Sequence, residues 1–438
     1  MCFPETFMNT FAETLSPQER RRGRLLACFA CYFGCISEVM LDGSAVIILY
    51  IGMLGGRKLE VMLSTGFSAI FSMLSMIFCA SLVTRMGMKR AATIACLAGC
   101  AGYLLMAAAP FFGPYRKAAV LTGCLIYCAQ RSLYGATWYP MLDAFLRPQD
   151  RGSFFGNMRY TYMILSGVLL YGVGKLMGKN PPVELMQTVI GITGLLLLGR
   201  MFCMRRFPEN PEEARSHLNI RAALGIALRN GPLVSYAVYA CLLLLAQTSL
   251  VPVTLLYLRY HVKLAEGTVQ IFSTVGIAGC VAAYFCYGFL QRKLKIKYLE
   301  LFVHLTLICA ALLLAFLHKE TPGFIYIAGA VYFSASFANA IFACNNSIEL
   351  LALARPGNKP MAMAFLQTYQ NIGVSIGRAG TAMILGANLL APLWHFGSLE
   401  ICSYQTLFLL YGALLGILLV LFPMLPAVTP RHHDYYEP

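Results

Sequence analysis

The sequence predicts an all-α, polytopic membrane protein with twelve transmembrane helices arranged as two six-helix bundles. Of its 438 residues, 58% are hydrophobic and only 12% are charged, whereas soluble proteins carry about 25% charged residues. The mean hydropathy is +0.66. Apolar runs of about 20 residues, long enough to cross a bilayer as helices, recur along the whole chain. They do not alternate in the way that the strands of a membrane β-barrel do.

The predicted spans follow one another with short connections. The first half, 25–203, is expected to contain the spans 25–53, 60–82, 91–112, 117–145, 152–175 and 183–203. The second half, 232–426, is expected to contain 232–258, 267–290, 298–317, 322–351, 360–389 and 403–426. Residues 1–24 form a cytoplasmic lead and 427–438 a cytoplasmic tail. The linker 204–231 ends in an amphipathic helix, Ile220 to Arg229, expected on the membrane surface.

Two short basic turns occupy similar places in the two halves. The first is Ala80 to Thr93, ASLVTRMGMKRAAT, and the second is Gly288 to Lys297, GFLQRKLKIK. Each follows an apolar run. Their repetition predicts two similar halves within one chain.

The net charge of +15 is explained by orientation in a membrane. With a cytoplasmic N-terminus, the cytoplasmic segments hold about 22 Lys and Arg residues and the opposite loops about nine, which is the positive-inside bias. We therefore expect a multi-pass protein of the cell membrane with both termini in the cytoplasm and no nucleic-acid partner. The expected partners are a small-molecule substrate, protons and membrane lipid, and the protein is expected to be a monomer.

The sequence gives no indication of an enzyme, a cofactor or a metal site. Nearly all of the 16 cysteines lie within apolar spans, where cysteine behaves as a small hydrophobe. Cys28, Cys31 and Cys35 share a helix face, but no His or further Cys completes a ligand set. There is no Walker loop, HExxH motif or nucleophile elbow.

The first basic turn resembles the loop signature of the major facilitator superfamily, Gly-x-Leu-x-Asp-Arg-x-Gly-Arg-Lys. Leu82, Arg85, Gly87 and Lys89 match it, while Ala80, Thr84 and Met88 depart from it. The stretch RPQDRG, 147–152, and the spacing of Arg131 and Gly135 are similar to further signatures of that superfamily. The resemblance implies two six-helix bundles, with the first, fourth, seventh and tenth helices around a central cavity. The residues expected at a cytoplasmic gate are Arg85, Gly87, Lys89, Arg90, Asp143, Arg147, Arg292 and Glu349.

Three charged residues near the middle of predicted spans are the candidates for proton coupling. Glu38 and Asp42 lie four residues apart and hence on one helix face, and Arg131 lies in the fourth span. A charge at this depth costs about 2.5–3.5 kcal/mol even on insertion scales. The resemblance implies that both acids face Arg131 across the cavity. One guanidinium cannot neutralise two carboxylates, so one acid is expected to take up a proton; which of the two is open. The alternative is a buried salt bridge that only joins two helices.

Aromatic and amide side chains are the candidates for substrate binding. They are Tyr134, Trp138, Gln247, Asn339, Asn345, Gln367, Gln370 and Asn371, together with Arg378. The amides suit a hydroxylated solute such as a sugar, whereas Arg131 and Arg378 suit a carboxylate, and the sequence does not separate the two. We expect His304 to be a lone packed histidine, and Gly373 and Gly377 to serve helix packing.

These features predict a secondary active transporter that moves a small polar organic solute, sugar-like or anionic, by alternating access and with proton coupling. An efflux antiporter is the alternative, although Gly172-Val173-Gly174 lacks the Gly-Pro pair of the family's antiporter signature. A non-transporting membrane sensor or assembly factor is the alternative from another class. It would be expected to carry an added soluble domain, and the loops here are short.

The predicted orientation can be tested by labelling. Single cysteines placed at Met88, Asn210 and Lys295 in a cysteine-free background should react with a membrane-impermeant reagent only from the cytoplasmic side. Cysteines at Arg57 and Lys319 should react only from the outside. The opposite accessibility at any two of these positions would overturn both the orientation and the number of spans.

Overall fold

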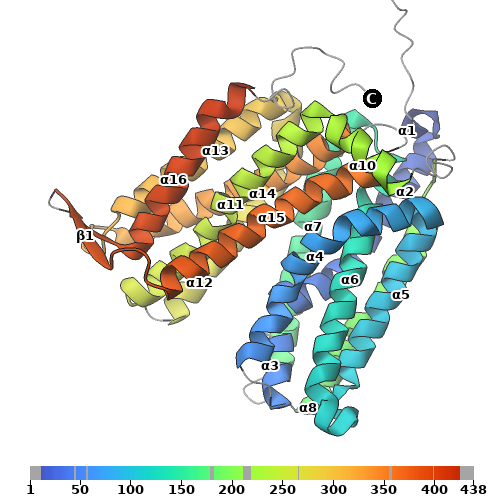
Figure 1. Ribbon diagram of the computed structural model, residues 1–438, viewed down its shortest axis with the longest axis horizontal. Coiled ribbons are helices and arrows are strands. Elements are labelled where there is room, and N and C mark those ends of the chain that lie inside the picture. Colours follow the sequence, from blue (N-terminus) through green and yellow to red (C-terminus); the bar gives the residue numbers. More distant parts are fainter. Residues whose placement is uncertain are drawn as a thin grey trace, which may run out of the picture.

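Two bundles of long helices, one from each half of the chain, make up the structure (Figure 1). The computed structural model describes residues 11–43, 46–55, 58–177, 182–210, 219–264, 266–354, 358–397 and 399–424. Within these residues every element is helical except one short hairpin. The predicted all-α class is therefore confirmed.

The first bundle is built from helices of the first half of the chain. In its first segment, α2 is followed directly by a π-helical turn, η1, and the short α3 begins three residues after that turn ends. The elements are α1 (Phe11–Thr14), α2 (Pro17–Glu38), η1 (Val39–Gly43), α3 (Val46–Met53), α4 (Lys58–Met86), α5 (Met88–Ala107), η2 (Ala109–Tyr115), α6 (Arg116–Asp143), η3 (Pro148–Asp150), α7 (Arg151–Met177) and α8 (Val183–Arg205).

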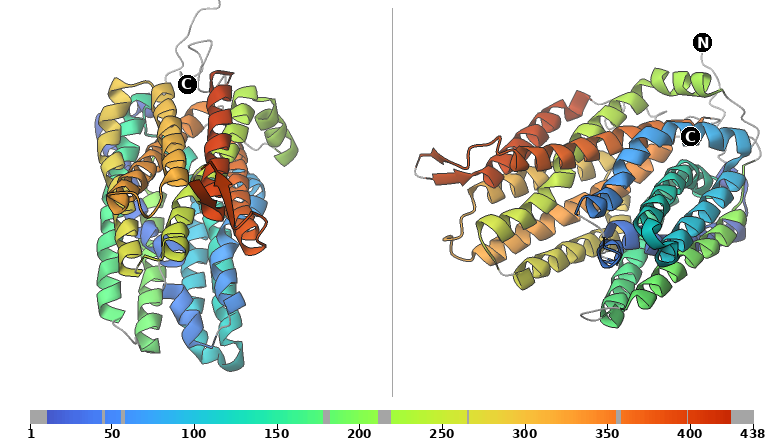
Figure 2. Two further views of the ribbon diagram at one scale, coloured as in Figure 1. Left: turned by 90° about the vertical axis from the view of Figure 1, so that its left-hand side faces the viewer. Right: turned by 60° about the horizontal axis from the view of Figure 1, so that its bottom comes forward.

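The second bundle follows a short helix, α10. A two-stranded antiparallel hairpin, in which Leu393 pairs with Cys402, precedes its last helix and projects from the bundle in the right-hand view of Figure 2. The elements are α10 (Ile220–Arg229), α11 (Gly231–Leu256), η4 (Tyr257–His261), α12 (Glu266–Lys293), α13 (Ile296–Phe316), α14 (Phe324–Leu353), α15 (Lys359–Gly386), β1 (Leu393–Phe396), β2 (Leu399–Cys402), α16 (Ser403–Leu421) and η5 (Phe422–Met424).

The described helices have the length and composition of a multi-pass membrane protein. Eight of them are long and apolar enough to cross a membrane. Helices α6, α7 and α15 are not among the eight, and each carries an arginine in its interior, namely Arg131, Arg159 or Arg378. Charged residues in membrane helices usually face the interior of the bundle or a water-filled cavity. These three helices are therefore where a polar site is expected.

A single glycine joins α4 to α5 in the first basic turn. Gly87 has φ +86°, in the region that glycine occupies without the steric penalty of a side chain. The turn brings two antiparallel helices together with Arg85 and Lys89 on either side of it. The backbone conformation of this turn therefore explains why glycine occupies position 87.

The two bundles converge at one end and diverge at the other (Figure 1). We call the end that holds α10 and the start of α2 the closed end, and the end that holds α3, the start of α8 and the hairpin the open end. Between the bundles, α4 contacts α15 and α7 contacts α12. A Cβ added to Gly156 of α7 would lie 2.9 Å from the carbonyl oxygen of Tyr284 in α12, so a residue without a side chain permits this contact.

Within the second bundle, two glycines of α15 lie directly against α11. A Cβ added at Gly373 would overlap the carbonyl oxygen of Cys241, and one added at Gly377 would overlap that of Leu245. The prediction that this pair serves helix packing is confirmed.

Replacement of Gly377 by Ala should therefore destabilise the protein, because the new methyl group must push α15 away from α11. Overpacking of this kind typically costs about 1–3 kcal/mol. Gly380 lies on the same helix with nothing within 4 Å of an added Cβ, and Gly380→Ala is the matched control. Thermal unfolding of the purified variants should show a lowered transition for Gly377→Ala only. Equal effects of the two substitutions would contradict this account of the interface.

Candidate functional site

A cavity of about 800 Å³ lies between the two bundles and is lined by polar side chains from both. Its first-bundle wall comes from α2, α4, α6, α7 and α8, and its second-bundle wall from α14 and α15. The predicted site residues that line it are Glu38, Arg131, Tyr134, Trp138, Gln367, Gln370, Asn371 and Arg378. Cavity residues that the sequence analysis did not nominate include Arg159, Tyr162, Arg200 and Asn346.

Glu38 forms an ion pair with Arg200 of α8. Nη2 of Arg200 donates to Oε1 of Glu38 at 2.9 Å. The Arg200 side chain is 2% exposed, whereas that of Glu38 is 32% exposed to the cavity. From the sequence we expected one guanidinium, that of Arg131, to face two carboxylates. The structure adds a second guanidinium, that of Arg200, which pairs with Glu38.

Three further features hold the Arg200 guanidinium in place. Its Nε donates to the carbonyl oxygen of Ala30 at 3.2 Å, and its Cζ lies 4.1 Å from the centre of the Tyr134 ring, within the range of a cation–π interaction. Gly34 of α2 leaves the space, since a Cβ at this position would coincide with the guanidinium. The aromatic candidate Tyr134 therefore also stabilises a cation of the first bundle.

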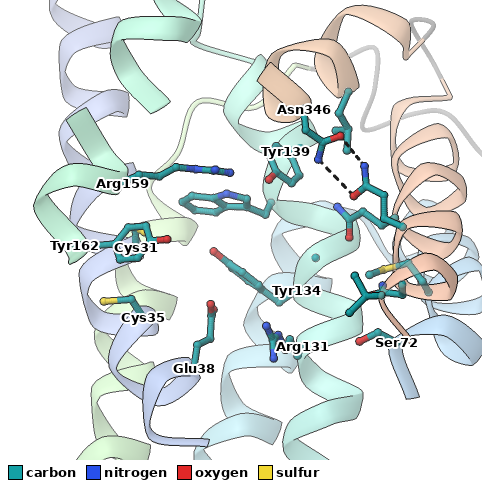
Figure 3. A pocket seen from close by; sticks show the side chains of 18 of the residues that line it. Cys31, Cys35, Glu38, Ser72, Arg131, Tyr134, Tyr139, Arg159, Tyr162 and Asn346 are labelled. Carbon is teal, nitrogen blue, oxygen red and sulfur yellow. Dashed lines mark hydrogen bonds between the residues drawn. The ribbon is translucent and has the colours of Figure 1, made fainter. Parts of the chain in front are cut away.

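Arg131 and Asp42, the other two coupling candidates, differ in what the structure describes. Arg131 extends into the cavity beside Glu38 and Tyr134 (Figure 3). The backbone of Asp42 lies in the π-helical turn η1, which directly follows Glu38, but its side chain lies outside the described residues. A π-helical turn is often found at functional sites.

On the second-bundle side, amides form part of the wall. Nε2 of Gln370 donates to Oδ1 of Asn346 at 2.6 Å, a contact drawn in Figure 3. Gln367 reaches across to α6, where its Oε1 would lie 3.2 Å from a Cβ placed on Gly135. The two cavity walls therefore approach each other closely at Gly135.

Arg159 joins the two bundles from within the cavity. Its Nη2 donates to the hydroxyl of Ser347 in α14 at 2.8 Å, and its Cζ lies 5.8 Å from the centre of the Tyr284 ring in α12. No described carboxylate forms an ion pair with Arg159 or with Arg378, the arginine of the opposite wall.

The cavity is therefore strongly cationic. Its described walls hold four guanidinium groups, from Arg131, Arg159, Arg200 and Arg378, and one carboxylate, from Glu38. Counting Asp42 as a second carboxylate still leaves two positive charges in excess. In a site partly removed from water, such charges attract an anion more strongly than they would at an open surface.

Three predicted substrate-binding residues do not line the cavity. Gln247 is buried within α11, Asn339 lies in α14, and Asn345 accepts a hydrogen bond from Tyr287 at 2.7 Å inside the second bundle. His304, expected to be a lone packed histidine, is fully buried and is stacked on Tyr239 with ring centres 5.6 Å apart. The expectation of a packed side chain is confirmed.

The residues predicted for a gate gather at the closed end but differ in their contacts. Asp143 of α6 accepts from Arg151 at 2.5 Å and also pairs with Lys359 of α15, which links the bundles. Arg147 donates to Asp150 at 2.9 Å, and this hydrogen bond raises the pKa of the Arg147 guanidinium. Lys89 lies 3.4 Å from Glu209. Arg85, Arg90 and Arg292 are exposed, and Glu349 is fully buried.

The residues described offer no metal centre: no group of three or more His, Cys, Asp or Glu side chains among them could hold an ion. The cavity provides charged and hydrogen-bonding side chains.

The model of the Major Facilitator Superfamily matches residues 39–378. The chain belongs to this superfamily. Its fold is that of the E. coli fucose:proton symporter FucP, with a TM-score of 0.72 and 12% identity over 92% of this chain and 99% of that one. The human organic anion transporter MFSD10 (TETRAN) gives 0.70 and 14% over 93% and 100%. The proton:xylose symporter XylE gives 0.69 and 12% over 94% and 97%. No curated protein matches the sequence.

Membership confirms the superfamily inferred from the loop signatures, and with it the multi-pass transporter fold. The roles of individual residues stay predictions. Arg200 was missed because it lies three residues before the predicted end of its span, where basic residues are common. Gly34, one turn before Glu38, was the one available signal that α2 leaves room for a large partner.

The space that Gly34 provides can be tested directly. Gly34→Ala should displace the Arg200 guanidinium and leave the Glu38 carboxylate without its partner, which lowers the temperature of unfolding. Gly34→Ala combined with Glu38→Gln should recover part of the loss, because the isolated charge is gone. Gly52→Ala, at a position with nothing within 4 Å of an added Cβ, serves as the control. Strictly additive effects of the two substitutions would contradict the coupling between them.

Proposed function

We propose that this protein is a secondary transporter that carries a small organic anion across the membrane by alternating access. The observation that carries the proposal is the placement of Arg159 and Arg378. They extend from opposite bundles into one cavity, and neither pairs with a described carboxylate. An anion bound between them would contact both bundles, as a transporter that closes around its substrate requires.

The same cavity argues for an anion over a neutral sugar. Two of the four cavity amides, Asn346 and Gln370, bind each other, and the described carboxylate, Glu38, is bound to Arg200. This leaves the amides of Gln367 and Asn371 for the hydroxyl groups of a sugar. Guanidinium groups bind carboxylates and phosphates with strong, charge-assisted hydrogen bonds. The similar structures include two sugar symporters and one organic anion transporter, and at 12–14% identity they support the fold and do not choose between these substrates.

The arrangement of the bundles supports alternating access with the structure in one of its two states. Cross-bundle contacts close one end, among them Lys359 with Asp143 and Gly156 with α12. The basic turn at Gly87 and the linker helix α10 lie at that end. Because the positive-inside bias assigns them to the cytoplasm, we propose that the structure is open to the outside. We further propose that the protein is a monomer of the plasma or inner membrane, with both termini in the cytoplasm.

Proton coupling is the second part of the proposal, and it centres on Glu38. An anion bound between Arg159 and Arg378 would bring a second negative charge into the cavity that Glu38 lines, and this would favour uptake of a proton from water by the Glu38 carboxylate. Substrate and proton would enter together, and the charge of the cavity would be conserved. Asp42 remains the alternative carrier in the same span.

Removal of either unpaired arginine should weaken anion binding. A charged hydrogen bond contributes about 1.5–3 kcal/mol, which corresponds to roughly a 10- to 100-fold loss of affinity. Arg378→Gln and Arg159→Gln should each show it in calorimetric titration with the best ligand from a thermal-shift screen of organic acids, phosphate esters, sugars and amines. Arg229→Gln, on the exposed last turn of α10, should not. Tightest binding by a neutral sugar, unaffected by these variants, would refute the anion proposal.

Glu38→Gln should mimic the protonated acid. Exchange of labelled substrate between the two sides of proteoliposomes should continue, while accumulation driven by a pH gradient should be lost. Asp42→Asn is tested alongside it, because either acid could carry the proton. If both variants keep pH-driven accumulation, neither residue couples protons to transport.

A further inference from the structure

Glu300 is a buried acid that lies apart from the central cavity. It belongs to the first turns of α13 and is 0% exposed. No described Lys or Arg forms an ion pair with it. Its Oε2 accepts a hydrogen bond from the Tyr239 hydroxyl at 3.0 Å, whereas its Oε1 has no hydrogen-bond partner of standard geometry.

The groups that surround Glu300 are almost all neutral. From its own helix, Nδ1 of His304 lies 2.9 Å from the Glu300 carbonyl oxygen, and Lys297 lies over the Tyr298 ring. Helix α14 contributes the buried acid Glu349 and the amide of Asn345. The other packed elements contribute the phenols of Tyr236, Tyr239 and Tyr287 from α11 and α12, and Phe422 of η5.

We propose that Glu300 is a proton-binding site of the second bundle and carries its proton in this conformation. An ionised carboxylate removed from water without a cation is strongly disfavoured and is neutralised instead. The proton comes from water and protonates Oε1, so no other reactant is needed.

The unpaired atoms around the acid can accommodate a bound proton once the Asn345 amide is turned over. Nδ2 of Asn345, like Oε1 of Glu300, has no hydrogen-bond partner, although the two side chains lie close enough to interact. Turning over the Asn345 amide, whose nitrogen and oxygen are interchangeable in shape, places its oxygen toward Glu300. A protonated Oε1 then donates to this oxygen, and the amide nitrogen donates to the Tyr287 hydroxyl.

Helix α14 connects this site to the cavity through two consecutive asparagines. Asn345 faces the Glu300 cluster, while Asn346 lines the cavity and accepts from Tyr236 at 3.3 Å. The rings of Tyr236 and Tyr239 lie 5.7 Å apart, so hydrogen bonds and ring contacts run from Asn346 to Glu300. A shift of α14 on substrate binding would therefore change the surroundings of the acid. This coupling rests on the proposed transport function, whereas the proton site itself does not.

The proton site can be tested by infrared spectroscopy of the full-length purified protein. A protonated carboxylic acid has a carbonyl-stretch band that an ionised carboxylate lacks. At neutral pH this band should be present in the wild type and in the control Glu400→Gln, an exposed position on β2, and absent from Glu300→Gln. A band of unchanged intensity in Glu300→Gln would overturn the proposal.

A second variant keeps the test decisive if Glu300→Gln does not fold. Tyr239→Phe removes the hydroxyl that donates to Oε2, so the band should persist but move to higher frequency, and an unmoved band would overturn the assignment to Glu300. Both spectra are recorded without substrate. Failure of organic anions to bind would therefore refute the proposed transport function and leave the proton site untouched.

Discussion

The cost of an unpaired charge inside a membrane decides how this molecule is arranged. Arg200 of α8 is almost completely buried, and its charge is tolerated because Glu38, the Ala30 carbonyl and the Tyr134 ring surround it. These partners come from α2 and α6, so a single guanidinium holds three helices of the first bundle together. It can do so only because Gly34 leaves the space. The wall of the cavity, and the cations that it presents, depend on this arrangement.

The contacts that close one end are of a different kind. Asp143 links Arg151 of its own bundle to Lys359 of the other, and the remaining close approach relies on glycine at position 156. The side chains of these ion pairs are only 5–14% exposed, so their charges are partly removed from water here and can be hydrated again when the bundles separate. Packed glycines separate without leaving a charge behind. The contacts between the bundles can therefore be broken and remade, whereas the contacts of Arg200 hold helices of one bundle together. A two-state transporter needs this difference, because the interface must open while the cavity wall stays intact.

The sequence predicted the features that depend on hydropathy. Long apolar runs gave the helices, and charges within those runs led to Glu38, Arg131 and Arg378 in the cavity. It could not separate Asn345 from Asn346, since neighbouring residues of a helix point about 100° apart and only the packing of α14 decides which one faces the substrate. It also missed Arg200, because the contact with Glu38 joins residues 162 positions apart. Pairings between distant helices leave no periodic trace in one sequence.

The excess of positive charge gives a physical reason for a conformational cycle under the proposed function. In the empty cavity Arg159 and Arg378 stand on opposite walls, and like charges repel more strongly where little water screens them. This repulsion favours the conformation in which the bundles stay apart at the open end. An anion bound between the two guanidinium groups reverses the sign of the interaction, so that both walls are drawn toward it. The charge of the substrate then favours closure of the bundles around it, and a neutral solute of the same shape would not favour this closure.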